Sequence, residues 1–339
     1  MQKKMVSGLL FLSLLLTTLI AGCGGTHSTE KAAGSKELMK LSLGFTSWPT
    51  NMLAYVAQEK GIFQKNGLEV SLKEFPSTTE SSNAFLAGNL DMCTYPAPDT
   101  IPPASEGAHF KVIMMTDKSL GSDGLVSRPE IKSIQDLKGK TVATQLYSVD
   151  HMYLLTLLDN AGMSAQDIKI VDMNMADAGS AFLAGKVDAA SIWEPYLSKA
   201  VNGGGKLLYS TKDNPDLITD CVAASAAVVK ERPEAVTAFV KSWNEAVLYW
   251  QNHRDEAEAI IAKRMNVTPE ECRAMMDTLH IATVQDSVEG FTKTEKSSYW
   301  GFTQQKIVSF LKELKVIKND VEAASLIDDT FVKKVANEK

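Results

Sequence analysis

Several residue patterns that mark enzymes are missing from this sequence. The five histidines are scattered, and no two of them stand at i and i+4 as they do in a zinc-binding helix. There is no Gly-x-Ser-x-Gly segment, and no cysteine stands with a histidine in a familiar protease motif. We therefore predict no metal site, no cofactor and no catalytic nucleophile.

Positive charge is also scarce. The chain has 35 Lys and Arg against 41 Asp and Glu, and no basic run interleaved with aromatic residues. This balance disfavours a nucleic-acid partner. The segment Gly139-Lys140-Thr141 looks like the end of a phosphate-binding loop, but the glycine that should open such a loop would fall at Ile134. A nucleotide site is not supported.

The N-terminus has a short hydrophobic run, too short to span a bilayer comfortably. Lys3 and Lys4 precede an uncharged apolar run from Leu9 to Ile20, the layout of a secretory signal. The small residues directly before Cys23 resemble a bacterial lipobox. That resemblance implies a signal peptide over 1–22, cleavage before Cys23, lipid on its thiol, and anchoring to the extracytoplasmic face of a bacterial cell membrane. Residues 23–37 are small and polar, which predicts a flexible tether.

Three further cysteines follow, at Cys93, Cys221 and Cys272. An odd number in an exported protein leaves at least one thiol free. Cys93 and Cys221 both fall on strand-like segments, so they could form a disulfide or remain buried thiols. The sequence leaves both possibilities open.

The most informative feature is a repeated octet. Residues 84–91 read AFLAGNLD and residues 181–188 read AFLAGKVD, identical at six of eight positions. Each copy has the pattern of a helix end, a glycine stop and a following strand. Similarity extends upstream, where the strand-like residues 41–45 correspond to 141–145. A period near 100 residues predicts two similar α/β lobes with a ligand-binding cleft between them.

The order of predicted elements gives the domain boundaries. The predicted chain crossings fall at 117–128 and 218–223, and a strand is expected at 221–229. An apolar stripe at helical spacing from Val236 to Trp250 predicts a core helix. The predicted parts are a first lobe at 38–125, a second lobe at 126–219, and a return to the first lobe with C-terminal helices at 220–339.

Ligands of open α/β sheets bind beyond the carboxyl ends of strands, near helix N-termini. This rule points to segments rich in hydroxyls and aromatic rings, which can fix a polar head group and exclude water. Trp48 and Trp193 could instead be packing residues, and Asp123 and Asp220 could be hinge or cap residues. The predicted ligand-binding residues are Ser47, Trp48, Pro49, Thr50, Thr94, Tyr95, Ser122, Asp123, Gln145, Tyr147, Ser148, Trp193, Glu194 and Asp220.

Four motifs together resemble the solute-binding proteins of ABC importers in the nitrate/sulfonate/taurine group, which are related to binding proteins for thiamine-pyrimidine precursors. They are the AxxxGIFxxxGLxV pattern from Ala57 to Val70, the repeated octet, the DLKGKTVA run at 136–143, and the WEPY run at 193–196. The resemblance covers roughly residues 41 to 250. It implies the two-lobed type II periplasmic-binding fold with two crossover strands, and delivery of a solute to a membrane permease driven by an ATPase.

The family's cleft loops map onto Trp48-Pro49, Tyr95, Ser122-Asp123, Tyr147-Ser148 and Trp193-Glu194. This chain departs from the family in charge, because no Arg or Lys lies in these loops. Asp123, Glu194 and Asp220 would repel a small anion, which puts nitrate in doubt. The composition favours a solute with hydrogen-bond donors, such as a taurine-like amino sulfonate or a heterocyclic amine.

The sequence therefore predicts a monomeric, lipid-anchored solute-binding protein that is not an enzyme. Two other classes stay open. The fold also serves pyrimidine synthases of thiamine biosynthesis, although those carry clustered cysteines while Cys93, Cys221 and Cys272 are far apart. An extracytoplasmic sensor that signals to a membrane receptor is the third hypothesis.

Overall fold

The computed structural model describes residues 37–213, 217–296 and 299–338. The predicted signal peptide, Cys23 and nearly all of the tether lie outside the described residues. Residues 37–339 form one compact unit, in which the strands make two separate sheets.

The first sheet has six strands in the order β11-β4-β10-β3-β1-β2. Strands β1, β2 and β3 are mutually parallel, whereas β10 runs antiparallel to both β3 and β4. The central strands are buried along most of their length, as a sheet covered on both faces requires. The strand bounds are β1 Met39–Thr46, β2 Leu68–Phe75, β3 Met92–Pro96, β4 Phe110–Ser119, β10 Thr219–Ser225 and β11 Leu279–Ile281.

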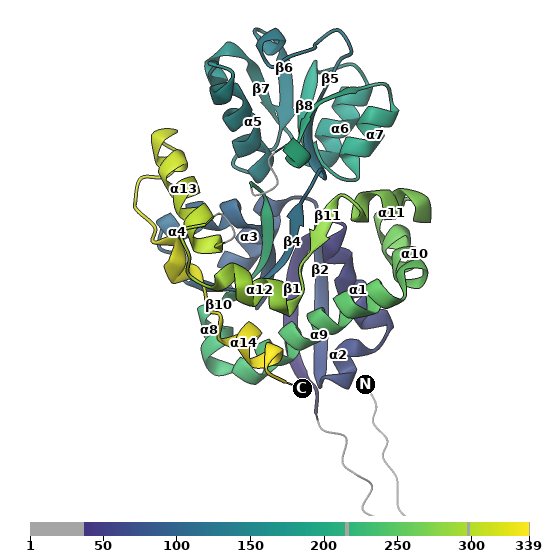
Figure 1. Cartoon of the computed structure of the whole chain (residues 1–339), viewed down its shortest axis with the longest axis vertical. Coiled ribbons are helices and arrows are strands. Elements are labelled where there is room, and N and C mark those ends of the chain that lie inside the picture. Colours follow the sequence, from purple (N-terminus) through teal and green to yellow (C-terminus); the bar gives the residue numbers. More distant parts are fainter. Residues whose placement is uncertain (1–36, 214–216, 297–298, 339) are drawn as a thin grey trace, which may run out of the picture. The chain divides into compact units, whose positions relative to one another are not determined.

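The second sheet has five strands in the order β7-β6-β8-β5-β9. Strand β6 is parallel to β7 and β8, and β5 is antiparallel to β8 and β9. Helix α5 (Val149–Asn160) flanks this sheet on one side, and α6 (Met175–Leu183) and α7 (Tyr196–Asn202) flank it on the other (Figure 1). The strand bounds are β5 Asp123–Ser127, β6 Thr141–Thr144, β7 Lys169–Asp172, β8 Ala189–Trp193 and β9 Lys206–Ser210.

The two sheets share one plan. In each, the strand that arrives from the other sheet is inserted in antiparallel orientation, β10 between β3 and β4 and β5 between β8 and β9. The chain leaves the first sheet after Ser119 and enters the second at Asp123; it leaves the second after Ser210 and re-enters the first at Thr219. The predicted two-lobed α/β fold with two crossover strands is confirmed. The first crossing ends inside the region assigned to lobe one, because β5 already belongs to the second sheet.

The repeated octets form the same joint in both lobes. Helix α3 (Thr78–Leu86) ends at Gly88 with a φ of 79°, and α6 ends at Gly185 with a φ of 75°. In each copy the amide N–H after the glycine donates to a carbonyl five residues earlier, at 3.0 and 2.9 Å. This is the Schellman arrangement, which favours glycine because a left-handed backbone strains other residues.

The last residue of each octet ties this joint to the corresponding strand of its lobe, β1 or β6. The Ser42 amide donates to the Asp91 carboxylate at 2.9 Å, and the Thr141 amide donates to the Asp188 carboxylate at 2.7 Å. Asp91 also pairs with Arg232, which begins the C-terminal helices. The repeated glycine and aspartate therefore make the same helix-ending turn and the same backbone hydrogen bond in both lobes.

Helices from the C-terminal third cover the first sheet. The predicted stripe on α9 is core: Val236, Phe239, Trp243 and Val247 are each fully buried. Helices α9, α12 and α14 pack on strands of this sheet (Figure 1). The bounds of these three and of the other helices not yet given are α1 Leu53–Glu59, α2 Ile62–Lys65, α4 Ile101–Ser105, α8 Ala226–Glu231, α9 Pro233–Asn252, α10 Arg254–Met265, α11 Pro269–Met276, α12 Val284–Phe291, α13 Trp300–Glu313 and α14 Thr330–Ala336.

One predicted strand is wrong in its second half. We expected a strand at 221–229, but β10 ends at Ser225 and the next residues form α8. The Ser225 hydroxyl accepts a hydrogen bond from the Val228 amide at 3.2 Å. This side-chain cap starts a helix in a run whose composition also suits a strand. Cys93, Cys221 and Cys272 are free and buried, so the possible disulfide is not formed.

The shared joint predicts matched effects of substitution in the two lobes. Gly88→Ala and Gly185→Ala should each lower the free energy of unfolding by about 1–2 kcal/mol, the strain of a left-handed non-glycine residue. No atom lies within 3.4 Å of either added Cβ, so a steric clash adds nothing. Urea unfolding measures both values. The exposed neighbour Lys186→Ala serves as control and should change stability by less than about 0.5 kcal/mol. Wild-type stability in both glycine variants would contradict this account of the repeat.

Candidate ligand-binding site

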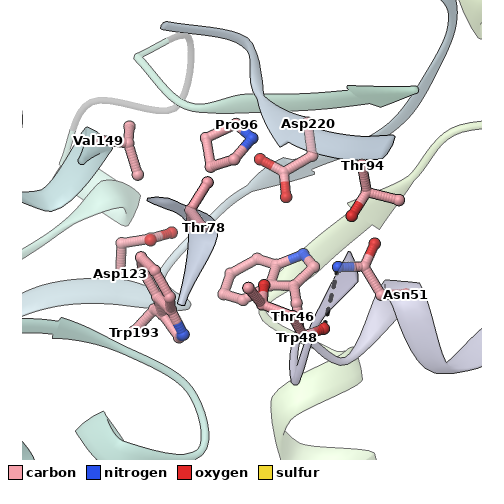
Figure 2. A pocket seen from close by; sticks show the side chains of 10 residues that line it. All are labelled: Thr46, Trp48, Asn51, Thr78, Thr94, Pro96, Asp123, Val149, Trp193 and Asp220. Carbon is pink, nitrogen blue, oxygen red and sulfur yellow. Dashed lines mark hydrogen bonds between the residues drawn. The ribbon is translucent and has the colours of Figure 1, made fainter. Parts of the chain in front are cut away.

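A pocket lies between the two sheets, where strand ends of both lobes converge (Figure 2). The empty space at this pocket is about 330 Å³, a figure that includes space open to solvent. The first lobe contributes the end of β1, the start of α3 and parts of β3 and β10. The second contributes the start of β5, the start of α5 and the end of β8. The lining residues are Thr46, Trp48, Asn51, Thr78, Thr94, Pro96, Asp123, Val149, Trp193 and Asp220.

Five of the fourteen predicted site residues line this pocket: Trp48, Thr94, Asp123, Trp193 and Asp220. Trp48, Thr94 and Asp220 come from the first lobe, and Asp123 and Trp193 come from the second. Figure 2 shows their side chains around one space. The structure therefore brings together residues that are up to 172 positions apart in the chain, from Trp48 to Asp220.

Four more predicted residues lie close to the pocket without lining it. Pro49 and Thr50 start the short 3-10 helix Thr50–Met52, directly after Trp48. Ser47 lines an adjoining opening on the surface. Gln145 is buried and donates from Nε2 to the Thr79 hydroxyl at 3.1 Å, which joins the second lobe to the first.

Three predicted residues point elsewhere. The Tyr95 ring is 1% exposed, stacks on Phe110 in the core of the first lobe, and donates its hydroxyl to Ser82 at 2.9 Å. Ser122 bonds to the Thr278 hydroxyl at 2.5 Å. The Glu194 carboxylate accepts bonds from the amide and hydroxyl of Ser198 at 3.1 and 2.6 Å. These groups hold the fold together and do not face the pocket.

Tyr147 and Ser148 line a second, separate cavity next to His151 and Asp99. The Ser148 hydroxyl donates to the Gln145 carbonyl at 2.7 Å and accepts from the His151 amide, so it caps α5. Tyr147 has a left-handed φ of 65°, and its side chain is 69% exposed. Neither residue reaches the pocket in Figure 2.

Four lining residues were not predicted: Thr46, Asn51, Thr78 and Val149. Pro96 belongs to the segment 94–96 that the strand-end rule selects, although it is not among the fourteen residues. Thr46 ends β1, and Thr78 and Val149 are the first residues of α3 and α5. The rule that ligands bind beyond strand ends and near helix N-termini also covers these positions, so the sequence could have predicted them. No sequence pattern marked Asn51, which lies inside the 3-10 helix Thr50–Met52.

The orientation of Trp48 is fixed by a buried acid. Its indole N–H donates to the two carboxylate oxygens of Asp117 at 3.2 and 3.4 Å. The Thr116 hydroxyl donates to the same carboxylate at 3.2 Å. Burial raises the pKa of Asp117 to about 6, while the Trp48 hydrogen bond acts in the opposite direction. Asp117 therefore positions the aromatic wall and does not line the pocket itself.

Acidic side chains crowd around this pocket. Burial raises the pKa of Asp123 to about 7; a bond from Ser119 opposes this, and repulsion by Asp117 and Glu194 adds to it. Burial, followed by repulsion from neighbouring aspartates, also raises the pKa of Asp150 and Asp220 well above the ordinary range. Strongly perturbed carboxyls in a cleft are typical of functional sites.

Among the described residues, no cluster of three His, Cys, Asp or Glu side chains could hold a metal ion. Within the same residues, no helix has the length and apolar character needed to cross a membrane.

Comparison with known families identifies the group to which the chain is related. The model of the family described as "NMT1/THI5 like" matches residues 48–257, which is more than half of the chain and includes every residue that lines the pocket except Thr46. The chain belongs to this family. The resemblance expected from the four motifs is thereby confirmed.

Individual family members extend the comparison to nearly the whole chain. A putative aliphatic sulfonates-binding protein of Bacillus subtilis is 27% identical over 327 residues, covering 94% of both chains. The alkanesulfonate-binding protein SsuA from Xanthomonas axonopodis, solved with MOPS bound, has a TM-score of 0.73 at 19% identity and covers 87% of this chain and 99% of its own. Escherichia coli SsuA has a TM-score of 0.70 at 23% identity, covering 85% and 97%.

The same fold also occurs in an enzyme. The desulfurization enzyme DszB has a TM-score of 0.66 at 15% identity and covers 88% of this chain. At that identity the likeness concerns the fold alone. The relatives in the preceding paragraph are binding proteins, and the chemistry of the site has to be taken from its own residues.

The buried carboxyls predict how stability depends on pH. Because the pKa of Asp123 is about 7 in the folded chain and 3.8 ordinarily, the folded state binds more protons between these values. Stability should therefore fall as pH rises from 5 to 8. Urea unfolding of the solute-free protein should show a loss larger than about 1.4 kcal/mol, the value of one pKa unit.

The stability of the Asp123→Asn variant should depend less on pH than the stability of the wild type. Asp159 is an exposed acid on α5, so the Asp159→Asn variant should keep the wild-type dependence of stability on pH. A stability that is constant or increases between pH 5 and pH 8 would show that these carboxyls are not held protonated by burial.

Proposed function

We propose that the chain is the solute-binding component of an ABC importer. It captures a small polar organic solute between two closing lobes outside the cytoplasm and delivers it to a membrane permease driven by an ATPase. The observation that carries this proposal is a pocket whose walls come from both lobes, in a chain whose relatives include a putative aliphatic sulfonates-binding protein.

The connections between the lobes support closure on the solute. Among the described residues, the chain passes between the two sheets after β4 and after β9, and domain closure typically changes the conformation of a few such connecting residues. The Gln145–Thr79 hydrogen bond joins the lobes directly beside the pocket. A solute bound between Trp48 and Trp193 would contact both lobes at once, so its binding energy would favour the closed arrangement.

Anchoring by lipid on Cys23 would keep the protein next to its permease. The signal-like run before Cys23 and the small polar residues after it support this part of the proposal. A monomer is sufficient for the function, because one chain supplies both walls of the pocket.

We further propose that the chain is not an enzyme. The cysteines of the described region are buried, and burial raises the pKa of the Cys93 and Cys272 thiols to about 12, which disfavours the reactive thiolate. The pocket lining includes carboxyls but no cysteine, serine or histidine to act as a nucleophile or proton relay. A sensor that signals to a membrane receptor would use the same capture step and differs in its partner.

One experiment tests anchoring and capture together. The full chain and a Cys23→Ser variant are expressed and fractionated, and each product is titrated by thermal shift with taurine, ethanesulfonate, nitrate, guanidinium and acetamidinium. The wild type should be in the membrane fraction and the variant in the soluble fraction. At least one solute should raise the Tm of both to the same extent, because binding to the folded state stabilises it.

Trp193→Ala should reduce the thermal shift, since it removes one wall of the pocket. Wild type and Cys23→Ser in the same fraction would refute the lipid anchor. A Tm that none of these solutes changes would contradict the proposed capture of a small polar solute.

A further inference from the structure

Several oxygen atoms at the pocket have no hydrogen-bond partner. Asp123 is 1% exposed, Asn51 is 2% exposed and Thr78 is 4% exposed, and all three line the pocket. Asp123 Oδ2, Asn51 Oδ1 and Thr78 Oγ1 meet no hydrogen-bonding group among the described residues. Buried polar atoms are almost always paired, so atoms left open at a cavity point to a ligand that completes them.

The unpaired atoms are chiefly acceptors. The Asn51 side chain already donates from Nδ2 to the Thr46 carbonyl at 3.2 Å, which leaves its Oδ1 to accept (Figure 2). Behind the lining, both carboxylate oxygens of Asp150 are also unpaired and fully buried. An occupant that satisfies the unpaired oxygens of the lining must carry several hydrogen-bond donors.

The charged side chains that line the pocket are all acidic. Asp123 enters the pocket from the second lobe and Asp220 enters from the first (Figure 2). None of the ten lining residues is Lys, Arg or His. Buried charges are normally paired, and here the described lining offers no cation to pair with.

The walls between these acids are aromatic. Trp48 and Trp193 come from opposite lobes, and each is 5% exposed. The faces of indole rings attract cations, and delocalised planar cations stack on them well. Such walls do not suit a metal ion, and the described residues include no metal-binding cluster.

We propose that the captured solute is a small organic cation whose charge is spread over a planar group of N–H donors, held between Trp48 and Trp193 and donating to Asp123 and Asp220. This inference rests on the proposed function and names its solute class. Amidinium and guanidinium ions have this chemistry. A simple alkanesulfonate or nitrate ion has no N–H to donate and would face two carboxyls.

Because the positive charge of the solute would favour ionised carboxyls, binding of the solute would also depend on pH. Without a cation the crowded carboxyls hold protons, and a bound cation favours their ionised form, so binding releases protons. A histidine also faces this group of acids: His280 interacts electrostatically with Asp117, and its Nε2 lies 3.1 Å from Oδ1 of Asp286. The titratable groups that surround Asp123 are Asp99, Asp117, Asp150, Tyr153, Glu194 and Asp220.

The test is calorimetric titration of the full chain with millimolar guanidinium, acetamidinium, ethanesulfonate, taurine, nitrate and Zn²⁺ at pH 5, 6, 7 and 8. At least one of the two organic cations should bind most tightly, at least tenfold more tightly at pH 8 than at pH 5. Titrations in two buffers of different ionisation enthalpy should show proton release. Asp123→Asn and Asp220→Asn should each weaken cation binding at least tenfold, while Asp159→Asn should not.

The wild-type pH profile decides the question even if a variant does not fold. Tighter binding of ethanesulfonate, taurine or nitrate, with affinity that falls as pH rises, would overturn the organic cation and leave the proposed function standing. Tight binding of Zn²⁺ alone would also overturn it. If no probe binds, both the cation and the proposed capture of a small solute fail.

Discussion

The burial of acidic side chains between two lobes, with no basic residue lining the pocket beside them, is the constraint on which this site depends. Asp123 and Asp220 face the pocket, and Asp117 and Asp150 lie directly behind it. Such a cluster is costly in the absence of a ligand, since each group must hold a proton or repel its neighbours. Strain stored in this way is typical of ligand clamps and other functional sites.

The duplicated fold explains how these acids come together. In each lobe the octet joint follows a helix, α3 or α6, and its aspartate accepts a hydrogen bond from the backbone of β1 or β6. The inserted strands then bring the acids in: Asp123 opens β5 and Asp220 lies near the start of β10. Both crossings therefore deliver a carboxyl to the pocket as the chain passes between the lobes. The same fold carries sulfonate-binding relatives, so the solute is set by these side chains and not by the architecture.

Much of this organisation could be predicted from the sequence, because it depends on local signals. The repeated glycine and aspartate marked both joints, the strand-end rule found Trp48 and Trp193, and the predicted chain crossings supplied Asp123 and Asp220. Side-chain direction was harder: on β3, Thr94 faces the pocket whereas the next residue, Tyr95, faces the core. Alternation along a strand fixes that these two differ but not which one faces the ligand. Asp117 was missed because the apolar run ends at Thr116, although β4 continues to Ser119.

The central claim is that the two lobes close on a positively charged solute held by buried carboxyls. Native mass spectrometry of the freshly purified full chain tests it most directly, because a solute captured during expression remains bound if its release is slow. The account predicts a bound small molecule that carries a permanent or protonated positive charge and is lost on acidification below pH 5. A co-purified anion, retained or bound more tightly at low pH, would contradict it.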